Sequence, residues 1–119
     1  MDLDGEVIRQ RVLLASFANG REYGMGARIA PQAKLDDGKL EAVVVEDRPV
    51  WQRFWHARRL ATGTANLAPR VITRQVTRAV LRGSAPLEYH VDGETGMAGE
   101  EVRIAIRPGA LRVRTMWQP

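Results

Sequence analysis

Apolar and polar side chains alternate residue by residue through much of this chain. From Val102 to Arg107, for example, Val, Ile and Ile alternate with Arg, Ala and Arg. Because successive side chains of a strand point to opposite faces, this period of two predicts antiparallel β-strands with one dry and one solvated face. The pattern from Val71 to Val80 predicts one continuous strand. The expected strands are residues 7–17, 40–46, 71–80, 87–91, 102–106 and 111–114.

Turn-forming dipeptides separate these segments. They are Asp4-Gly5, Asn19-Gly20, Asp37-Gly38, Asp92-Gly93 and Pro108-Gly109. Asn, Asp and Gly are the residues that best tolerate the backbone of tight hairpin turns, so each pair favours a reversal of the chain. The run from Ala42 to Val45 has no polar face, which predicts a strand that is buried on both sides.

One segment follows a helical period instead. Pro49 suits the first position of a helix, and aromatic residues recur after it at helical spacing, at Trp51, Phe54 and Trp55. One substantial helix is therefore expected at about residues 49–61. Its aromatic face has two readings, which are packing against the sheet and contact with a membrane interface. The whole pattern predicts a mostly β fold, an antiparallel β-sandwich with this one helix, in a single domain over residues 1–119.

The composition narrows the class of protein. The chain has 119 residues, a net charge of +4 and no cysteine, which excludes disulfides and cysteine-based metal sites or nucleophiles. No apolar run approaches the roughly 20 residues that span a bilayer, and the acidic start of the sequence is unlike a signal peptide. We therefore expect a cytoplasmic protein, with a peripheral position at the inner membrane face as an open alternative.

Arginine dominates the positive charge. Of the 18 basic residues, only Lys34 and Lys39 are lysine. Arginine binds phosphates, acidic lipid headgroups and nucleic acids well, but it also solvates the outer faces of strands. The arginines are spread along the sequence, and few aromatic residues accompany them on strands, which argues against a nucleic-acid partner.

Two acidic turns are the candidates for chemistry. Asp36-Asp37-Gly38 could bind a hard cation through one carboxylate and neighbouring main-chain carbonyls, or it could be an ordinary turn. In Asp92-Gly93-Glu94, the glutamate could act as a general base, or it could simply belong to a hairpin. The residues alone leave both choices open.

Taken together, the motifs resemble the C-terminal domain of the bacterial diacylglycerol-kinase-type lipid kinases, over nearly the whole chain. The Asn19-Gly20 pair and the segment from Tyr23 to Gly26 match glycine-rich elements of that family, with Met25 in place of a family glycine. Asp37-Gly38 and the Asp92-Gly93-Glu94 turn match two further elements.

The resemblance implies roles for particular residues. Asp37 would bind a structural Mg²⁺ through its carboxylate, together with the main-chain carbonyls of Lys34 and Lys39. Glu94 would be the general base that takes the proton from a lipid hydroxyl during attack on the γ-phosphate of ATP. The nucleotide would be bound by an N-terminal domain whose Gly-Gly-Asp-Gly-Thr motif this sequence lacks. The chain alone is therefore expected to be inactive. It is expected to act with that nucleotide-binding domain on a lipid at a membrane surface, and exposed strand edges would favour a homo-oligomer.

The competing hypothesis is a non-catalytic β module that binds anionic lipid, or another acidic partner, through its arginines and the aromatic helix. It predicts salt-sensitive binding to vesicles that depends neither on Glu94 nor on Mg²⁺.

Overall fold

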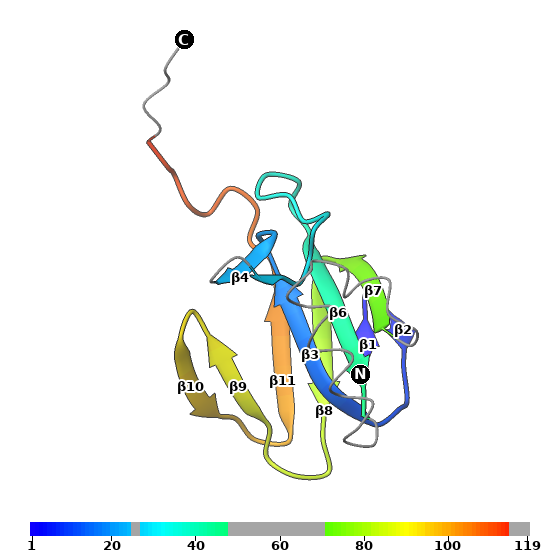
Figure 1. Cartoon of the computed structure of the whole chain (residues 1–119). Coiled ribbons are helices and arrows are strands. Elements are labelled where there is room, and N and C mark those ends of the chain that lie inside the picture. Colours follow the sequence, from blue (N-terminus) through cyan, green and yellow to red (C-terminus); the bar gives the residue numbers. More distant parts are fainter. Residues whose placement is uncertain (25–26, 48–70, 115–119) are drawn as a thin grey trace.

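The computed structural model describes residues 1–24, 27–47 and 71–114 (Figure 1). All regular structure in these three ranges is β-strand, as the alternating pattern predicted. The helix expected at about residues 49–61 lies outside the described residues. Within the described residues, no helix is long and apolar enough to cross a membrane.

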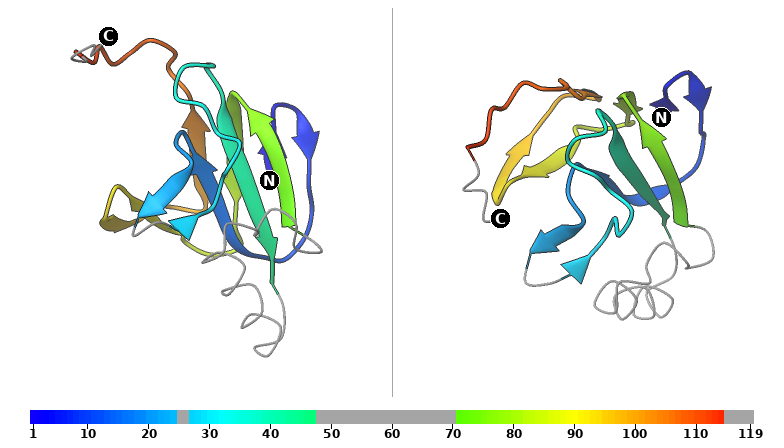
Figure 2. Two further views of the ribbon diagram at one scale, coloured as in Figure 1. Left: turned by 45° about the horizontal axis from the view of Figure 1, so that its top comes forward. Right: turned by 90° about the horizontal axis from the view of Figure 1, so that it is seen from above.

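Two antiparallel sheets form the body of the domain and face each other (Figures 1 and 2). The first has the order β3-β6-β7, with β3 at Val12–Ala18, β6 at Leu40–Glu46 and β7 at Val71–Val76. The second has the order β11-β8-β1-β2, with β11 at Glu101–Ala105, β8 at Arg78–Arg82, β1 at Asp2–Leu3 and β2 at Glu6–Val7. Two smaller ribbons pair β4 (Glu22–Gly24) with β5 (Ala27–Arg28) and β9 (Glu88–Val91) with β10 (Glu94–Met97).

Strand β6 is the centre of the packing. On one face, Leu40 and Ala42 contribute to an apolar cluster with Leu3 and Ala79 of the opposite sheet. On the other face, Val43 packs with Ile29, Ala30 and Ala33. Val43 and Val44 are both almost fully buried, so the prediction of a strand covered on two sides is confirmed.

The prediction of one continuous strand from Val71 to Val80 is wrong, because the chain changes sheets at Thr77. Asp4 explains the break: its carboxylate accepts hydrogen bonds from the Thr77 backbone N–H (2.8 Å), the Thr77 hydroxyl (2.9 Å) and the Arg78 N–H (2.9 Å). These bonds hold the corner where β7 ends and β8 begins.

Two further strand predictions need correction. The segment 7–17 is interrupted between Val7 and Val12, where the chain crosses from one sheet to the other. Residues Leu111–Arg114 form no strand. Beyond the Pro108-Gly109 turn this segment runs away from both sheets, so its backbone has no neighbouring strand to pair with (Figure 1).

Candidate functional site

The β9–β10 hairpin continues the ribbon formed by β8 and β11. Gly83 N–H donates to the Glu100 carbonyl (2.9 Å) just beyond the β8–β11 ladder. Ala98 N–H then donates to the Leu87 carbonyl (2.8 Å) before the β9–β10 ladder begins. The hairpin is therefore anchored at its base by the sandwich, and its tip projects to one side (Figure 1).

The turn at this tip fixes where Glu94 lies. Asp92 and Gly93 have φ angles of 48° and 94°, the positive values that the right-handed twist of a two-residue hairpin favours. Glu94 follows as the first residue of β10, directly opposite Val91. The sequence motif thus presents an exposed carboxylate at the end of a two-stranded ribbon.

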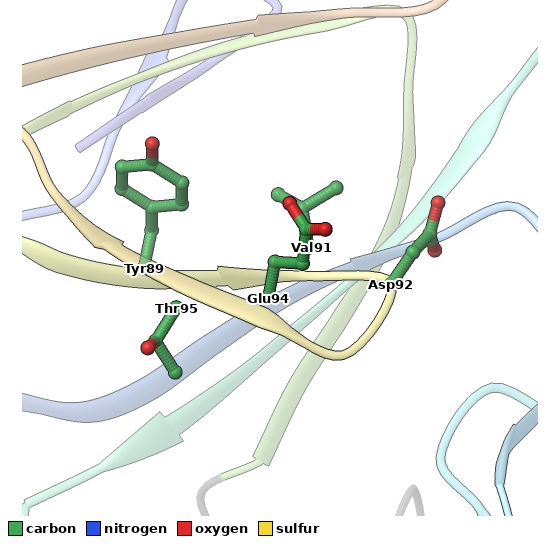
Figure 3. Close-up of a pocket in the computed structure, with 5 residues that line it drawn as sticks. All are labelled: Tyr89, Val91, Asp92, Glu94 and Thr95. Carbon is green, nitrogen blue, oxygen red and sulfur yellow. The ribbon is translucent and has the colours of Figure 1, made fainter.

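The surroundings of Glu94 on this face combine apolar and polar groups. Tyr89, Val91 and Glu94 project from the same side of the hairpin, whereas Thr95 points to the other (Figure 3). With Asp92 and Thr95 they line an open hollow of about 470 Å³. Exposed fractions of 45% for Tyr89 and 59% for Val91 leave both side chains available for contact with a ligand.

Gly96 allows the Tyr89 ring to lie across the hairpin. The two residues are cross-strand partners, and a Cβ added to Gly96 would lie only 2.5 Å from Cζ of Tyr89. A side chain at position 96 would therefore displace the ring that borders Glu94. The sequence analysis missed this pair, although the register that brings the residues together follows from the predicted Asp92-Gly93 turn.

The three predicted metal-binding residues lie together in the loop that leads into β6. Asp37 Oδ1 accepts a hydrogen bond from the Lys39 backbone N–H (2.9 Å), which turns the carboxylate back toward the main chain. Gly38 has φ of 68°, and a Cβ there would lie 3.3 Å from Cγ of Pro108. A hydrogen bond also joins this loop to the segment that follows Asn19-Gly20. Nε of Arg21 donates to the Ala33 carbonyl (3.3 Å).

The donor set of this loop suits Mg²⁺ chemically. A carboxylate and main-chain carbonyls are hard oxygen ligands, and an exposed loop leaves room for the water molecules that Mg²⁺ retains. Within the described residues, no hydrogen bond engages the second oxygen of Asp37. Among the described residues, no three His, Asp or Glu side chains converge on a common point, so a cation here would depend on the main chain.

Glu94 and the Asp37 loop occupy different places in the domain. The loop lies at the top of the sandwich in Figure 1, and the hairpin lies at its side. The left view of Figure 2 also separates them. The catalytic role of Glu94 and the metal role of Lys34, Asp37 and Lys39 stay predictions, with geometry that is compatible with each.

Comparison with known proteins gives the context of these two elements. The sequence model of the "YegS C-terminal NAD kinase beta sandwich-like domain" matches residues 1–115. The protein named "Probable lipid kinase YegS-like" from Pseudomonas syringae pv. tomato is 31% identical over 106 residues, which cover 88% of this chain and 33% of the relative. Proteins of the same name are 30% identical in Pseudomonas aeruginosa strain UCBPP-PA14, over 85% of this chain and 32% of the relative, and in Stenotrophomonas maltophilia, over 82% and 31%. The chain thus spans about a third of the length of the curated relatives that it matches.

Proposed function

The chain belongs to the family of YegS C-terminal β-sandwich domains, and from this premise we propose that it is the acceptor-side domain of an ATP-dependent lipid kinase. The observation that carries the proposal is the position of Glu94. A positive-φ turn presents its carboxylate at the tip of an anchored ribbon, beside exposed apolar side chains. This arrangement supports contact between one carboxylate and the hydroxyl end of a lipid.

In the proposed reaction, the Glu94 carboxylate accepts the proton of the lipid hydroxyl. The hydroxyl oxygen forms a bond to the γ-phosphorus of ATP while the bond from that phosphorus to the bridging oxygen breaks, and ADP leaves. A carboxylate serves this purpose because it needs only to reach the acceptor oxygen. The charge of the phosphoryl group is handled by cationic groups elsewhere.

Mg²⁺ would be held by the carboxylate of Asp37 and the carbonyl oxygens of Lys34 and Lys39. When bound, it would supply structural stability by fixing the loop that precedes β6. Asp37 and Gly38 would set the loop conformation, and the two lysine side chains would point away from the cation. The loop packs near Pro108, so its order would extend to the turn that follows β11.

ATP would be bound mainly by a separate nucleotide-binding domain of the same enzyme, which is the partner that this proposal requires. We expect the chain alone to be inactive for that reason. The site of action would be the cytoplasmic face of a membrane, where diacylglycerol-like acceptors are found.

The experiment is transfer of the γ-phosphate from labelled ATP to diacylglycerol vesicles in the presence of Mg²⁺. The chain would be assayed alone and mixed with the nucleotide-binding domain of a related lipid kinase. We expect activity only in the mixture, and a loss of at least about 100-fold with Glu94→Gln, in line with removal of a general base. Glu88→Gln is the matched control, because it neutralises a carboxylate on the opposite face of the same hairpin.

If the Glu94→Gln chain, mixed with the nucleotide-binding domain, has the activity of the wild-type mixture, Glu94 is not the general base. A chain with no activity in any mixture, but with salt-sensitive binding to anionic vesicles, would instead favour the non-catalytic lipid-binding module. The observation that favours this second candidate is the exposure of Arg82 and Arg103 on the outer face of β8 and β11. Glu101 pairs with both arginines, which reduces the positive charge that this face offers to an anionic lipid.

A further inference from the structure

The two outer faces of the sandwich differ. The loop that follows β5 covers the outer face of the β3-β6-β7 sheet, where Ile29 packs against Val43. On the other sheet, Leu81 and Ile104 point inward to the apolar cluster, so the side chains that alternate with them in β8 and β11 point outward. We call this second outer face the basic face. Its residues are Asp2, Arg78, Val80, Arg82, Glu101, Arg103 and Ala105, and all of them except Asp2 and Val80 are exposed.

Glu101 holds two of these arginines in place. Its Oε2 atom accepts a hydrogen bond from Nε of Arg82 (2.8 Å), and its Oε1 atom accepts one from Nε of Arg103 (2.6 Å). The bond from Arg103 is the main cause that lowers the pKa of Glu101 below its ordinary 4.5, so the carboxylate is charged at neutral pH. In the described part of the chain, no acceptor engages the terminal nitrogens of either guanidinium, and the two arginine side chains are 63% and 78% exposed.

We propose that the basic face is the surface by which this domain docks on an anionic phospholipid bilayer. Guanidinium groups bind phosphate oxygens through paired N–H donors, and the terminal nitrogens of Arg82 and Arg103 are available for such bonds. Arg78 adds a third positive charge, against the two carboxylates of Asp2 and Glu101. The inference goes beyond the proposed function, because it requires neither ATP nor a catalytic carboxylate.

The spacing of the arginines favours a surface over a single soluble phosphate. Arg78 and Arg82 lie four positions apart on one strand, which is about 13 Å, so one phosphate group cannot bridge them. A bilayer repeats its phosphates, and several weak contacts then act together. A protein partner would instead need a large apolar anchor, whereas the apolar side chains of this face are Val80 and Ala105. An anionic bilayer therefore fits the face best.

Docking by the basic face would also set the place of the candidate site. The β9–β10 hairpin continues the ribbon of β8 and β11, and the bond from Gly83 N–H to the Glu100 carbonyl joins the two parts. A domain that rests on a bilayer through β8 and β11 therefore brings the base of this hairpin close to the same bilayer.

The test is co-sedimentation of the chain with vesicles of phosphatidylcholine and phosphatidylglycerol in equal parts, and with vesicles of phosphatidylcholine alone. We expect binding to the anionic vesicles only, and weaker binding as the salt concentration rises. One basic residue near an anionic membrane changes the binding constant about fivefold. Arg82→Gln and Arg103→Gln should therefore each weaken binding about three- to fivefold. Glu101→Gln should strengthen it by a similar factor, because it removes a negative charge from the same face.

A second pair of arginine and glutamate provides matched controls. Nε of Arg28 lies 3.6 Å from Oε1 of Glu22, and the Arg28 side chain is 62% exposed, much like Arg82. This pair belongs to the β4–β5 ribbon, which leads into the loop that covers the opposite outer face. Arg28→Gln and Glu22→Gln make the same changes of net charge, and each should alter binding by less than about twofold, because salt screens charges that lie far from the bilayer.

The controls decide between a docking face and net charge alone. Binding that Arg82→Gln weakens and Arg28→Gln leaves unchanged supports the inference. If Arg28→Gln weakens vesicle binding as much as Arg82→Gln, net charge drives the binding and the basic face is not a docking surface. Equal binding to neutral vesicles, or no binding to either kind, also overturns the inference. None of these results bears on Glu94, which the phosphate-transfer assay tests separately.

Discussion

At the residue scale, Asp4 shows how one side chain can fix the route of a chain between two sheets. Its carboxylate accepts bonds from Thr77 and Arg78, and its own N–H donates to the Arg78 carbonyl (3.2 Å). The hydrogen bond from the Thr77 backbone is the main cause that lowers the pKa of Asp4 from its ordinary value of 3.8. Hydrogen bonds to a carboxylate favour its charged form in this way.

This lowered pKa predicts a defined loss of stability in acid. A group whose pKa is lower in the folded state stabilises the fold fully above the unfolded value, and loses that contribution as the pH falls through the folded value. Asp4 should therefore contribute fully above about pH 4 and progressively less below it. We expect Asp4→Asn to lower the melting temperature by a few degrees at pH 7, with a difference from wild type that shrinks toward pH 3.

Thermal unfolding followed by circular dichroism across this pH range is the measurement. Asparagine retains the positive φ of 50° at position 4, so the comparison isolates the hydrogen bonds. Asp36→Asn, in an exposed loop, serves as the control for loss of one charge. A difference between wild type and Asp4→Asn that is constant from pH 7 to pH 3 would contradict the link to the carboxylate.

Other residue-level features lie beyond sequence patterns. Glu41 occupies β6 with only 7% of its surface exposed, and its Oε2 atom has no hydrogen-bond partner in the part of the chain that the structure describes. A pattern of polarity places a glutamate in solvent, because an unpaired buried carboxylate is costly. Its burial depends on the loop around Ile29–Ala33, which covers this face of β6. Such a covering can be seen only in three dimensions.

At the element scale, the sequence predicts the central strand well, but it predicts poorly the points where the chain passes from one sheet to the other. Strand β6 was expected at residues 40–46 and is found there, because its apolar run lies between a clear turn and a change of pattern. The Asp92-Gly93 turn was also predicted and confirmed, whereas the strand that follows it, β10, was not among the expected strands. By contrast, the break at Thr77 was not predicted, because alternation continues through it and the cause is a carboxylate more than 70 positions away in the sequence.

In the candidate site, too, local features were predictable and features that depend on strand pairing were not. The turn motif located Glu94 and the Asp37 loop, because both depend on local backbone chemistry. The neighbours of Glu94 depend on cross-strand register, which brings Val91 opposite Glu94 and Tyr89 opposite Gly96. The roles of Glu94 and Asp37 came from the family resemblance and not from the pattern of polarity, because exposed acidic turns are common in β-proteins.

The hairpin gives the prediction at this scale. Gly96→Ala should force the Tyr89 ring from its place, since the new Cβ would lie 2.5 Å from Cζ. The atoms that the new Cβ would meet belong to the outer end of a ring that is 45% exposed and can turn away, so the cost stays below the about 1–3 kcal/mol of overpacking in a well-packed core. We expect changed NMR shifts for the Tyr89 ring protons, together with a destabilisation of about 1 kcal/mol in urea unfolding.

Gly99→Ala is the matched control, because nothing lies within 4 Å of a Cβ at that position. It should change the free energy of unfolding by less than about 0.5 kcal/mol. If the two variants are equally stable, the Tyr89 ring does not need the space above Gly96.

At the scale of the whole molecule, the described surface exposes several large apolar side chains outside the hairpin. The most exposed are Leu111 at 81%, Leu35 at 76% and Val113 at 70%. Leu111 and Val113 alternate with Arg112 and Arg114, which is the pattern of a strand with one dry face. This segment lies away from both sheets, so its dry face and its backbone are both open to a partner strand.

We therefore predict that the isolated chain self-associates through this segment. An extended segment with unpaired backbone groups can add to an exposed sheet edge of a second copy, with the apolar side chains giving the contact its affinity. The edge strand β3 offers a template, since its outer side has no neighbour in the described sheet and Leu13 and Leu14 are each 44% exposed.

Sedimentation equilibrium over a range of concentrations should show reversible association of the wild-type chain. The double variant Leu111→Ser/Val113→Ser should be monomeric over the same range. Leu35→Ser removes a leucine of similar exposure from the loop before β6, so the Leu35→Ser chain should associate like the wild type. If Leu35→Ser suppresses association as strongly as the double variant, general surface hydrophobicity drives it, and a strand-like contact by Leu111–Arg114 is excluded.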